Sequence, residues 1–185
     1  LGRSVALESG SYLDFLLPGL VAMSSMNNSY NWVASALNLN RVYYKTFQVF
    51  VQAPVSPSAI LAGEILAGMA KGLFASLLII VVGALASGLG VFSLPFVCAV
   101  LVNCFLFASL GVITGMVTKY HEDTATYSNF FIMPMAFFSG TFFPVSSMPW
   151  YLQWFIKMLP LTHTNILIRK ASFDVEGIVS LGVLL

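Results

Sequence analysis

Residues that could do chemistry are few in this chain. Its 185 residues include only two histidines, His121 and His163, and two cysteines. A zinc site needs three or four converging ligands, and a serine hydrolase needs a serine, a histidine and an orienting group. His121 stands beside Glu122 and Asp123 in a segment that we interpret as a solvated loop, and no second cluster of this kind follows. We therefore expect no catalytic residue, metal site or cofactor on this chain.

A phosphate-binding loop of the GxxxxGKS or GxxxxGKT type is also missing from the sequence. Such a loop holds the phosphates of ATP with its backbone N–H groups and its lysine. If ATP drives this protein, ATP and Mg²⁺ must bind to a partner subunit. The net charge of +1 indicates no nucleic-acid partner.

Polar side chains inside apolar stretches are the more informative residues. Glu64 and Lys71 are seven residues apart, so they share one face of a helix. Asn27 and Asn28 stand in the middle of an earlier apolar stretch. Such groups are costly in lipid unless they are paired or face protein or a water-filled path. For Glu64 and Lys71 two interpretations stay open: mutual neutralisation with a snorkelling lysine stem, or a Lys71 that faces a cavity between subunits.

Three long runs without Asp, Glu, Lys or Arg decide the class of protein. They cover residues 15–40 (26 residues), 72–118 (47 residues) and 124–156 (33 residues). Only 8% of the chain is charged, 58% is hydrophobic and the mean hydropathy is +0.90, whereas about 25% of a soluble domain is charged. A helix needs about 20 mostly apolar residues to cross a membrane. The sequence therefore predicts an all-α, polytopic transmembrane helical bundle in a lipid bilayer.

We expect one transmembrane domain over residues 1–185, incomplete at both ends because the chain begins without Met and stops inside an apolar stretch. The predicted spans cover residues 13–37, 58–86, 94–117 and 125–143, with a partial span at 176–185. Small residues spaced by four let helices approach closely, as in Gly68 with Gly72 and Gly111 with Gly115. We expect these pairs to pack within the chain, with packing between copies as the alternative.

A polar segment follows the first predicted span. Polar residues recur there at three- or four-residue spacing between apolar ones, and tyrosines suit the boundary between water and lipid. The pattern predicts an amphipathic helix over residues 41–53, lying at the membrane surface and ended by Pro54. The residues of this segment that could contact a partner protein are Arg41, Tyr44, Lys45, Gln48 and Gln52.

Aromatic residues and prolines dominate residues 144–170. Prolines interrupt helices, and tryptophan and tyrosine collect at membrane boundaries. We expect short re-entrant or interfacial helices here, which either form an outer gate or only anchor the chain at the boundary. The candidate residues for this role are Phe142, Phe143, Trp150, Trp154 and His163.

Five motifs resemble a known family of membrane proteins. They are residues 12–20 (YLDFLLPGL), 53–56 (APVS), 138–144 (FSGTFFP), 148–150 (MPW) and 159–163 (LPLTH). Together they are similar to the permease subunit of type-2 ATP-binding-cassette (ABC) exporters, in the branch with the nodulation lipo-oligosaccharide and daunorubicin-type drug export permeases. The motif at 138–144 followed by the motif at 159–163 is the most specific part, and the resemblance extends over nearly the whole chain.

The resemblance implies six spans, a cytoplasmic amino terminus, and a homo- or heterodimer of permease subunits with two ATPase subunits. This chain would lack the first span and most of the sixth. The protein would lie in the plasma (inner) membrane of a prokaryote, and residues 41–53 would lie on its cytoplasmic side and contact the ATPase. The cargo would be an amphipathic solute such as a lipo-oligosaccharide, a polysaccharide or a drug.

Two other classes of protein stay open from the residues alone. An ion-coupled secondary carrier would work without an ATPase, and the polar residues Asn27 and Lys71 are compatible with it. A membrane-embedded lipid or glycosyl transferase would need converging acids at the boundary, for which only Glu122 with Asp123 and Asp174 with Glu176 are candidates.

Overall fold

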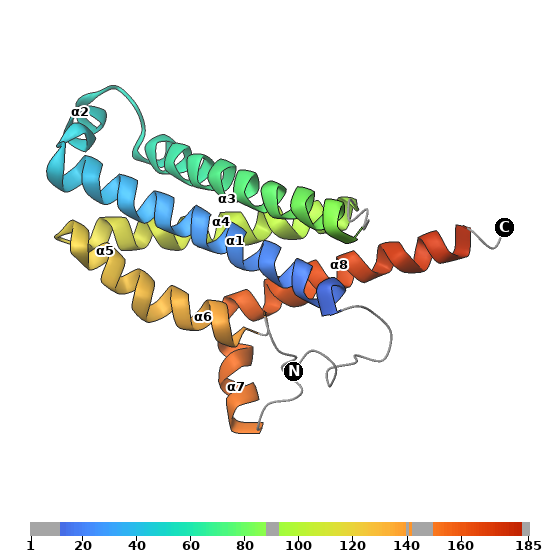
Figure 1. The fold of residues 1–185 in the computed structure, drawn as a ribbon. Helices are drawn as coiled ribbons and strands as arrows, with labels where there is room; N and C mark the ends of the chain where they lie inside the picture. The colour runs from blue at the N-terminus through green and yellow to red at the C-terminus, as the bar shows by residue number, and fades with distance from the viewer. Residues whose placement is uncertain (1–11, 88–92, 140, 142–149, 183–185) are drawn as a thin grey trace.

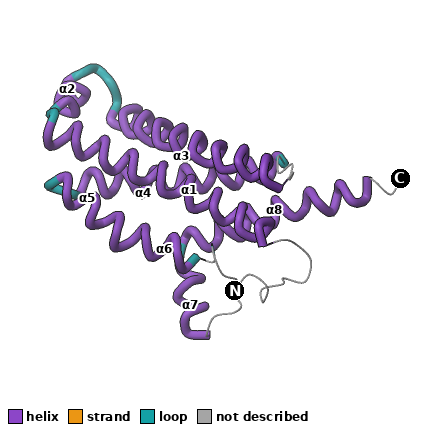
Figure 2. Tube along the Cα trace, in the orientation of Figure 1, coloured by secondary structure: helices purple, strands orange, loops and turns teal. Residues whose placement is uncertain are grey.

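The computed structural model describes residues 12–87, 93–139, 141 and 150–182. These residues form helices joined by short loops, and this part of the chain contains no strand (Figure 2). The all-helical prediction is confirmed. The helices are α1 (Tyr12–Asn38), the π-helix η1 (Leu39–Tyr43), α2 (Thr46–Gln52), α3 (Pro57–Ser87), α4 (Leu94–Val117), α5 (His121–Tyr127), the π-helix η2 (Ser128–Ile132), α6 (Met133–Phe138), α7 (Trp150–Met158) and α8 (Pro160–Gly182).

Helix α1 is the centre of the bundle (Figure 1). It packs along both α3 and α4, and α8 contacts α1 and α4. The core is made mainly of buried side chains from α1 and α4, such as Met26 and Phe107, and α8 adds Leu161 and Ile168. The sides of α1 that face α3 and α4 also bury the small polar side chains of Ser25 and Ser29.

All four glycines of the two small-residue pairs pack against α1. A Cβ atom at Gly72 would lie 2.8 Å from the Ser25 carbonyl oxygen, and one at Gly111 would lie 2.7 Å from the Tyr30 carbonyl oxygen. Cβ atoms at Gly68 and Gly115 would lie 3.1 Å from the Ser29 carbonyl oxygen and 3.0 Å from the Ala34 carbonyl oxygen, both also in α1. The expected packing within the chain is confirmed, and it lets α3 and α4 approach the α1 backbone directly.

Two helices are long and apolar enough to cross a membrane: α3 over Pro57–Leu85 and α4 over Leu94–Val117. They match two of the predicted spans. Helix α1 has 27 residues, about 40 Å at 1.5 Å per residue, but polar side chains interrupt its apolar sequence. The count of four complete spans stays a prediction.

The prediction of one amphipathic helix over residues 41–53 is wrong in its bounds. Lys45 has a left-handed backbone with φ of 56°, which ends η1 and starts α2 at Thr46. A lysine in this conformation cannot continue a right-handed helix. The chain uses this break to turn from α1 towards α3, so α2 is only seven residues long.

The last two predicted segments also differ from the structure. Helical residues begin at His121 rather than near 125, since the Asp123 carboxylate accepts the Tyr120 backbone N–H at 3.0 Å and caps α5. The π-helix η2 stands just before Pro134, whose ring would clash with a carbonyl of a regular α-helix. Helix α8 begins at Pro160, well before residue 176, because proline fits the first helical turn.

Two glycines of α3 test the close packing on α1. A Cβ atom at Gly72 would also lie 2.9 Å from the Cys104 Sγ, whereas a Cβ atom at Gly63 would meet nothing within 4 Å. Gly72→Ala should therefore destabilise the protein by roughly 1–3 kcal/mol. Gly63→Ala should leave it unchanged or stabilise it, because alanine favours helices. Thermal unfolding in detergent measures both, and a harmless Gly72→Ala would contradict this packing.

Candidate functional site

The end of the bundle that carries α2 is held together by one carbonyl group. Thr118 caps the end of α4, and its carbonyl oxygen accepts hydrogen bonds from the Asn38 amide at 3.0 Å and from Arg41 Nη2. The Asn38 amide also donates to the Thr118 hydroxyl at 2.9 Å. Asn38 is the last residue of α1 and Arg41 lies in η1. The ends of α1 and α4 are thus tied to the segment that leads into α2.

The structure divides the five predicted contact residues of this segment. Arg41 is half-buried and points into the bundle, so it is a brace rather than an outward contact. Tyr44, Lys45, Gln48 and Gln52 are all exposed. Their role as contact residues stays a prediction.

Apolar side chains of α2 are exposed beside those polar ones. Val49 is 65% exposed, Phe50 47% and Val51 62%. These residues lie in a short helix outside the helical bundle (Figure 1). Exposed apolar groups next to polar ones are typical of a protein contact surface.

Lys71 and Trp32 form the second feature of interest. The Lys71 ammonium nitrogen lies 4.1 Å from the centroid of the Trp32 ring, and both side chains are exposed. Among the described residues Lys71 makes no ion pair with Glu64, so the first interpretation, mutual neutralisation, is wrong here. A lysine at the centre of a spanning helix costs about 2.5–3.5 kcal/mol. A cation–π contact returns about 0.5–2 kcal/mol, so Trp32 offsets only part of that cost.

Asn27 and Asn28, the two predicted polar residues within the first apolar stretch, face different neighbours. Asn28 is exposed, and its amide donates to the Ser24 carbonyl oxygen at 3.0 Å. Asn27 is half-buried and lies one turn before Asn31, whose Oδ1 accepts from the Ser128 hydroxyl at 2.7 Å. Asn27 therefore belongs to the side of α1 that faces η2, and only Asn28 lies on the side of Trp32.

A buried polar cluster that the sequence analysis missed joins three helices. The Asn103 amide of α4 donates to the Ala22 carbonyl oxygen at 3.0 Å and to the Ser25 hydroxyl at 2.7 Å, both in α1. Its Oδ1 accepts from the Thr164 hydroxyl of α8 at 2.7 Å. Asn103 is the only amide side chain in the charge-free run over residues 72–118, and this was the signal that could have found it.

The boundary residues lie at another part of the bundle. Trp150 and Trp154 are exposed on α7, and Trp150 makes an edge-to-face contact with Tyr151 at 6.2 Å. His163 is exposed, and its Nε2 lies 2.8 Å from the Lys157 carbonyl oxygen, which links α8 to α7. Phe142 and Phe143 lie outside the described residues. The gate or boundary role of this region stays a prediction.

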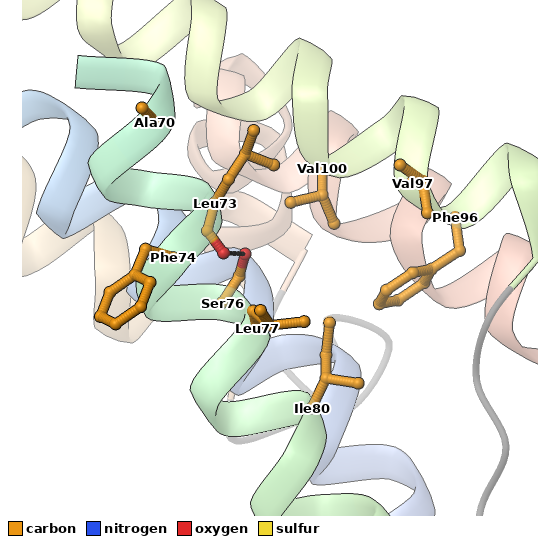
Figure 3. A pocket seen from close by; sticks show the side chains of 9 residues that line it. All are labelled: Ala70, Leu73, Phe74, Ser76, Leu77, Ile80, Phe96, Val97 and Val100. Carbon is orange, nitrogen blue, oxygen red and sulfur yellow. Dashed lines mark hydrogen bonds between the residues drawn. The ribbon is translucent and has the colours of Figure 1, made fainter. Parts of the chain in front are cut away.

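An apolar groove of about 420 Å³ lies between α3 and α4 (Figure 3). Its single polar side chain, Ser76, donates to the Leu73 carbonyl oxygen at 2.9 Å and so offers little to a ligand. The described residues also contain no group of three or more His, Cys, Asp or Glu that could hold a metal ion. The structure thus has the features of a helical membrane protein whose polar groups tie helices together.

Comparison with known proteins identifies the family. The sequence profile described as ABC-2 type transporter matches residues 3–173. The chain is 29% identical over 154 residues to the inner membrane transport permease YadH of Escherichia coli strain K12, which covers 83% of this chain and 60% of YadH. It is 31% identical over 182 residues to nodulation protein J of Sinorhizobium fredii, covering 96% of this chain and 68% of that protein. No solved structure matches.

The chain therefore belongs to the ABC-2 type transporter family, which confirms the resemblance drawn from its motifs. It spans only 60% of the length of YadH. Its function as part of a whole transporter is accordingly a matter for proposal.

The Asn103 cluster makes a specific prediction about stability. Asn103→Leu keeps the size of the side chain but removes its hydrogen bonds to α1 and α8, so that the Ser25 and Thr164 hydroxyls keep only the bonds to carbonyl oxygens of their own helices. We expect a cost of about 1–3 kcal/mol. Asn103→Leu combined with Thr164→Val should cost less than the sum of the two changes. Thermal unfolding in detergent measures this coupling.

The matched control is Ser109→Ala in the same helix, because the Ser109 hydroxyl bonds only to the Phe105 carbonyl oxygen at 2.8 Å. It should change stability little. Strict additivity of the two cluster changes would show that Asn103 and Thr164 act independently.

Proposed function

We propose that this chain is the permease subunit of an ATP-driven ABC exporter in the plasma (inner) membrane of a prokaryote. Membership of the ABC-2 type transporter family supports the class of protein. The name of the relative YadH, an inner membrane transport permease, supports the location. Two permease subunits, alike or different, would form the pathway for an amphipathic solute. The name of the relative nodulation protein J refers to nodulation and specifies no cargo.

The observation that carries the proposal is the exposed surface of α2, next to a segment that Asn38 and Arg41 hold to the Thr118 carbonyl oxygen. Gln48 and Gln52 of α2, with Tyr44 and Lys45 just before it, give this surface polar contacts. Val49, Phe50 and Val51 give it apolar ones. A partner ATPase that holds ATP and Mg²⁺ would bind there. Its closure on ATP shifts the transporter only if ATP binds more tightly to one state of the permease than to the other.

Transmission from this surface follows the Thr118 carbonyl. Arg41 in the middle of η1 and Asn38 at the end of α1 both bond to that oxygen, and α5 begins three residues after Thr118. A displacement of α2 is therefore delivered to α1, α4 and α5 together. The aromatic residues of α7, at another part of the bundle, are the proposed outer boundary or gate.

A substitution on α2 tests the docking surface. Phe50→Glu places a charge in the apolar part of the proposed contact and should lower co-purification of the ATPase by about tenfold or more. Met158→Glu is the matched control, since Met158 is also exposed but lies on α7, away from α2 (Figure 1). Equal co-purification of both variants would remove α2 from the docking surface.

A second substitution separates docking from transmission. Arg41→Met removes the bond to the Thr118 carbonyl but leaves the exposed surface of α2 in place. We expect the ATPase to co-purify as before, while ATP-driven transport in proteoliposomes falls by about tenfold or more because the brace is lost. Thermal unfolding of the same variant controls for a loss of the fold.

Proteoliposomes also separate the exporter from its alternatives. Transport that needs the ATPase and ATP supports the proposal. Transport driven by an ion gradient without the ATPase would instead indicate a secondary carrier, and covalent change of the solute would indicate a transferase.

A further inference from the structure

Lys71 lies at the middle of the most exposed apolar helix. It is the fifteenth of the 29 residues of the candidate span Pro57–Leu85. Its ammonium group has one partner among the described residues, the Trp32 ring at 4.1 Å. That contact offsets only part of the cost of a cation at this depth, as argued above. A further partner of negative charge is therefore favoured at this point.

The register of α3 on α1 places Asn28 near the path of the Lys71 side chain. Cβ atoms at Gly68 and Gly72 would lie 3.1 Å from the Ser29 carbonyl oxygen and 2.8 Å from the Ser25 carbonyl oxygen. The two helices thus run antiparallel, with the Lys71 backbone near the level of Met26. The Lys71 side chain reaches along α1 to the Trp32 ring, and Asn28 lies between these two levels on the Trp32 side of α1. The Asn28 amide nitrogen donates to Ser24, which leaves its Oδ1 as an exposed acceptor for a hydroxyl group.

The two directions along α3 from Lys71 differ in chemistry. Towards Ser87, the same helix face carries Phe74, Leu78 and Val82, which are 62%, 52% and 65% exposed. Towards α2, this face carries Glu64, which has no ion-pair partner among the described residues. An anion at Lys71 is repelled on the Glu64 side, and an attached alkyl chain finds apolar surface on the other side.

Depth decides what kind of anion can reach this position. Head groups of resident lipids stay at the membrane surface, about 15 Å from the centre of the hydrocarbon layer. An anionic head group that meets Lys71 is therefore one that is crossing the membrane.

We propose that Lys71, Trp32 and Asn28 form a transit site for the anionic head group of an amphiphile, whose alkyl chain lies along Phe74, Leu78 and Val82. This inference deepens the proposed export function and rests on it. The shared chemistry is a phosphate or carboxylate on an alkyl chain, and its source is either the exported solute or a membrane lipid.

Trp32 provides a direct reporter of binding, since the chain has three tryptophans and the other two are Trp150 and Trp154. The variant Trp150→Phe/Trp154→Phe leaves Trp32 as the only one. In neutral-lipid vesicles without ATPase, dodecyl phosphate should change its emission saturably. Dodecyl maltoside and dodecyltrimethylammonium should not. In the same protein Lys71→Met should weaken binding of dodecyl phosphate about tenfold or more.

Two matched variants control for the fold and for unspecific charge. Lys71→Arg keeps the cation and should keep the response. Lys119→Met removes an exposed lysine outside the spans and should also leave the response unchanged. Vesicles that contain phosphatidylglycerol distinguish the source: competition with dodecyl phosphate indicates a lipid, and no competition indicates the exported solute.

Three outcomes would overturn the inference. One is an equal response to neutral and anionic probes, and the second is a Lys71→Met protein that binds dodecyl phosphate as before. The third is a Lys71→Met protein that loses association between permease subunits, which would assign Lys71 to a partner's carboxylate. Binding of dodecyl phosphate is measured without ATP. If the protein binds this probe as expected but shows no ATP-driven transport, the result would contradict the proposed export function and not this site.

Discussion

Polar groups placed in lipid must be satisfied within the protein, and this constraint explains the arrangement around α1. The hydroxyls of Ser25 and Ser29 donate to carbonyl oxygens one turn earlier in α1, at 3.0 Å and 2.6 Å. Asn103 and Thr164 extend this pairing to α4 and α8. The glycines of α3 and α4 bring those helices close enough to seal the same groups from lipid. A helix with so many polar residues is stable at the centre of the bundle because each neighbour either bonds to it or covers it.

The sequence predicted the parts that depend on local composition. Runs without charge specify helices because a backbone in lipid can bond only within itself. The glycine spacing in residues 68–72 and 111–115 specified close packing, since no other residue leaves the backbone so bare. Five motifs were enough to indicate the family. These features require no knowledge of which helix is the neighbour of which.

The parts that sequence could not predict depend on contacts between distant residues. The helix break at Lys45 arises from the turn between α1 and α3, and nothing in its residue type indicates a left-handed backbone. The partner of Lys71 is Trp32 on α1 and not Glu64, about two turns away on α3, so spacing within one helix could not identify it. Asn103 stands out in the sequence as the only amide side chain in its charge-free run. Its role in joining three helices could not be predicted, because it depends on Ser25 and Thr164, which only the fold brings beside it.

Symmetry limits where a second, identical permease subunit could sit. Two like chains around an axis along the membrane normal hold each residue and its copy at one depth. Direct contact through the face of Lys71 would oppose two ammonium groups in a medium that hardly screens them. That face is therefore better suited to border a space between subunits or lipid than to form the contact itself. The exposed aromatic residues along η2 and α6, such as Phe130, Phe131 and Phe137, carry no such charge. In a dimer of like chains the tight contact and the proposed transit surface at Lys71 thus belong on different helices.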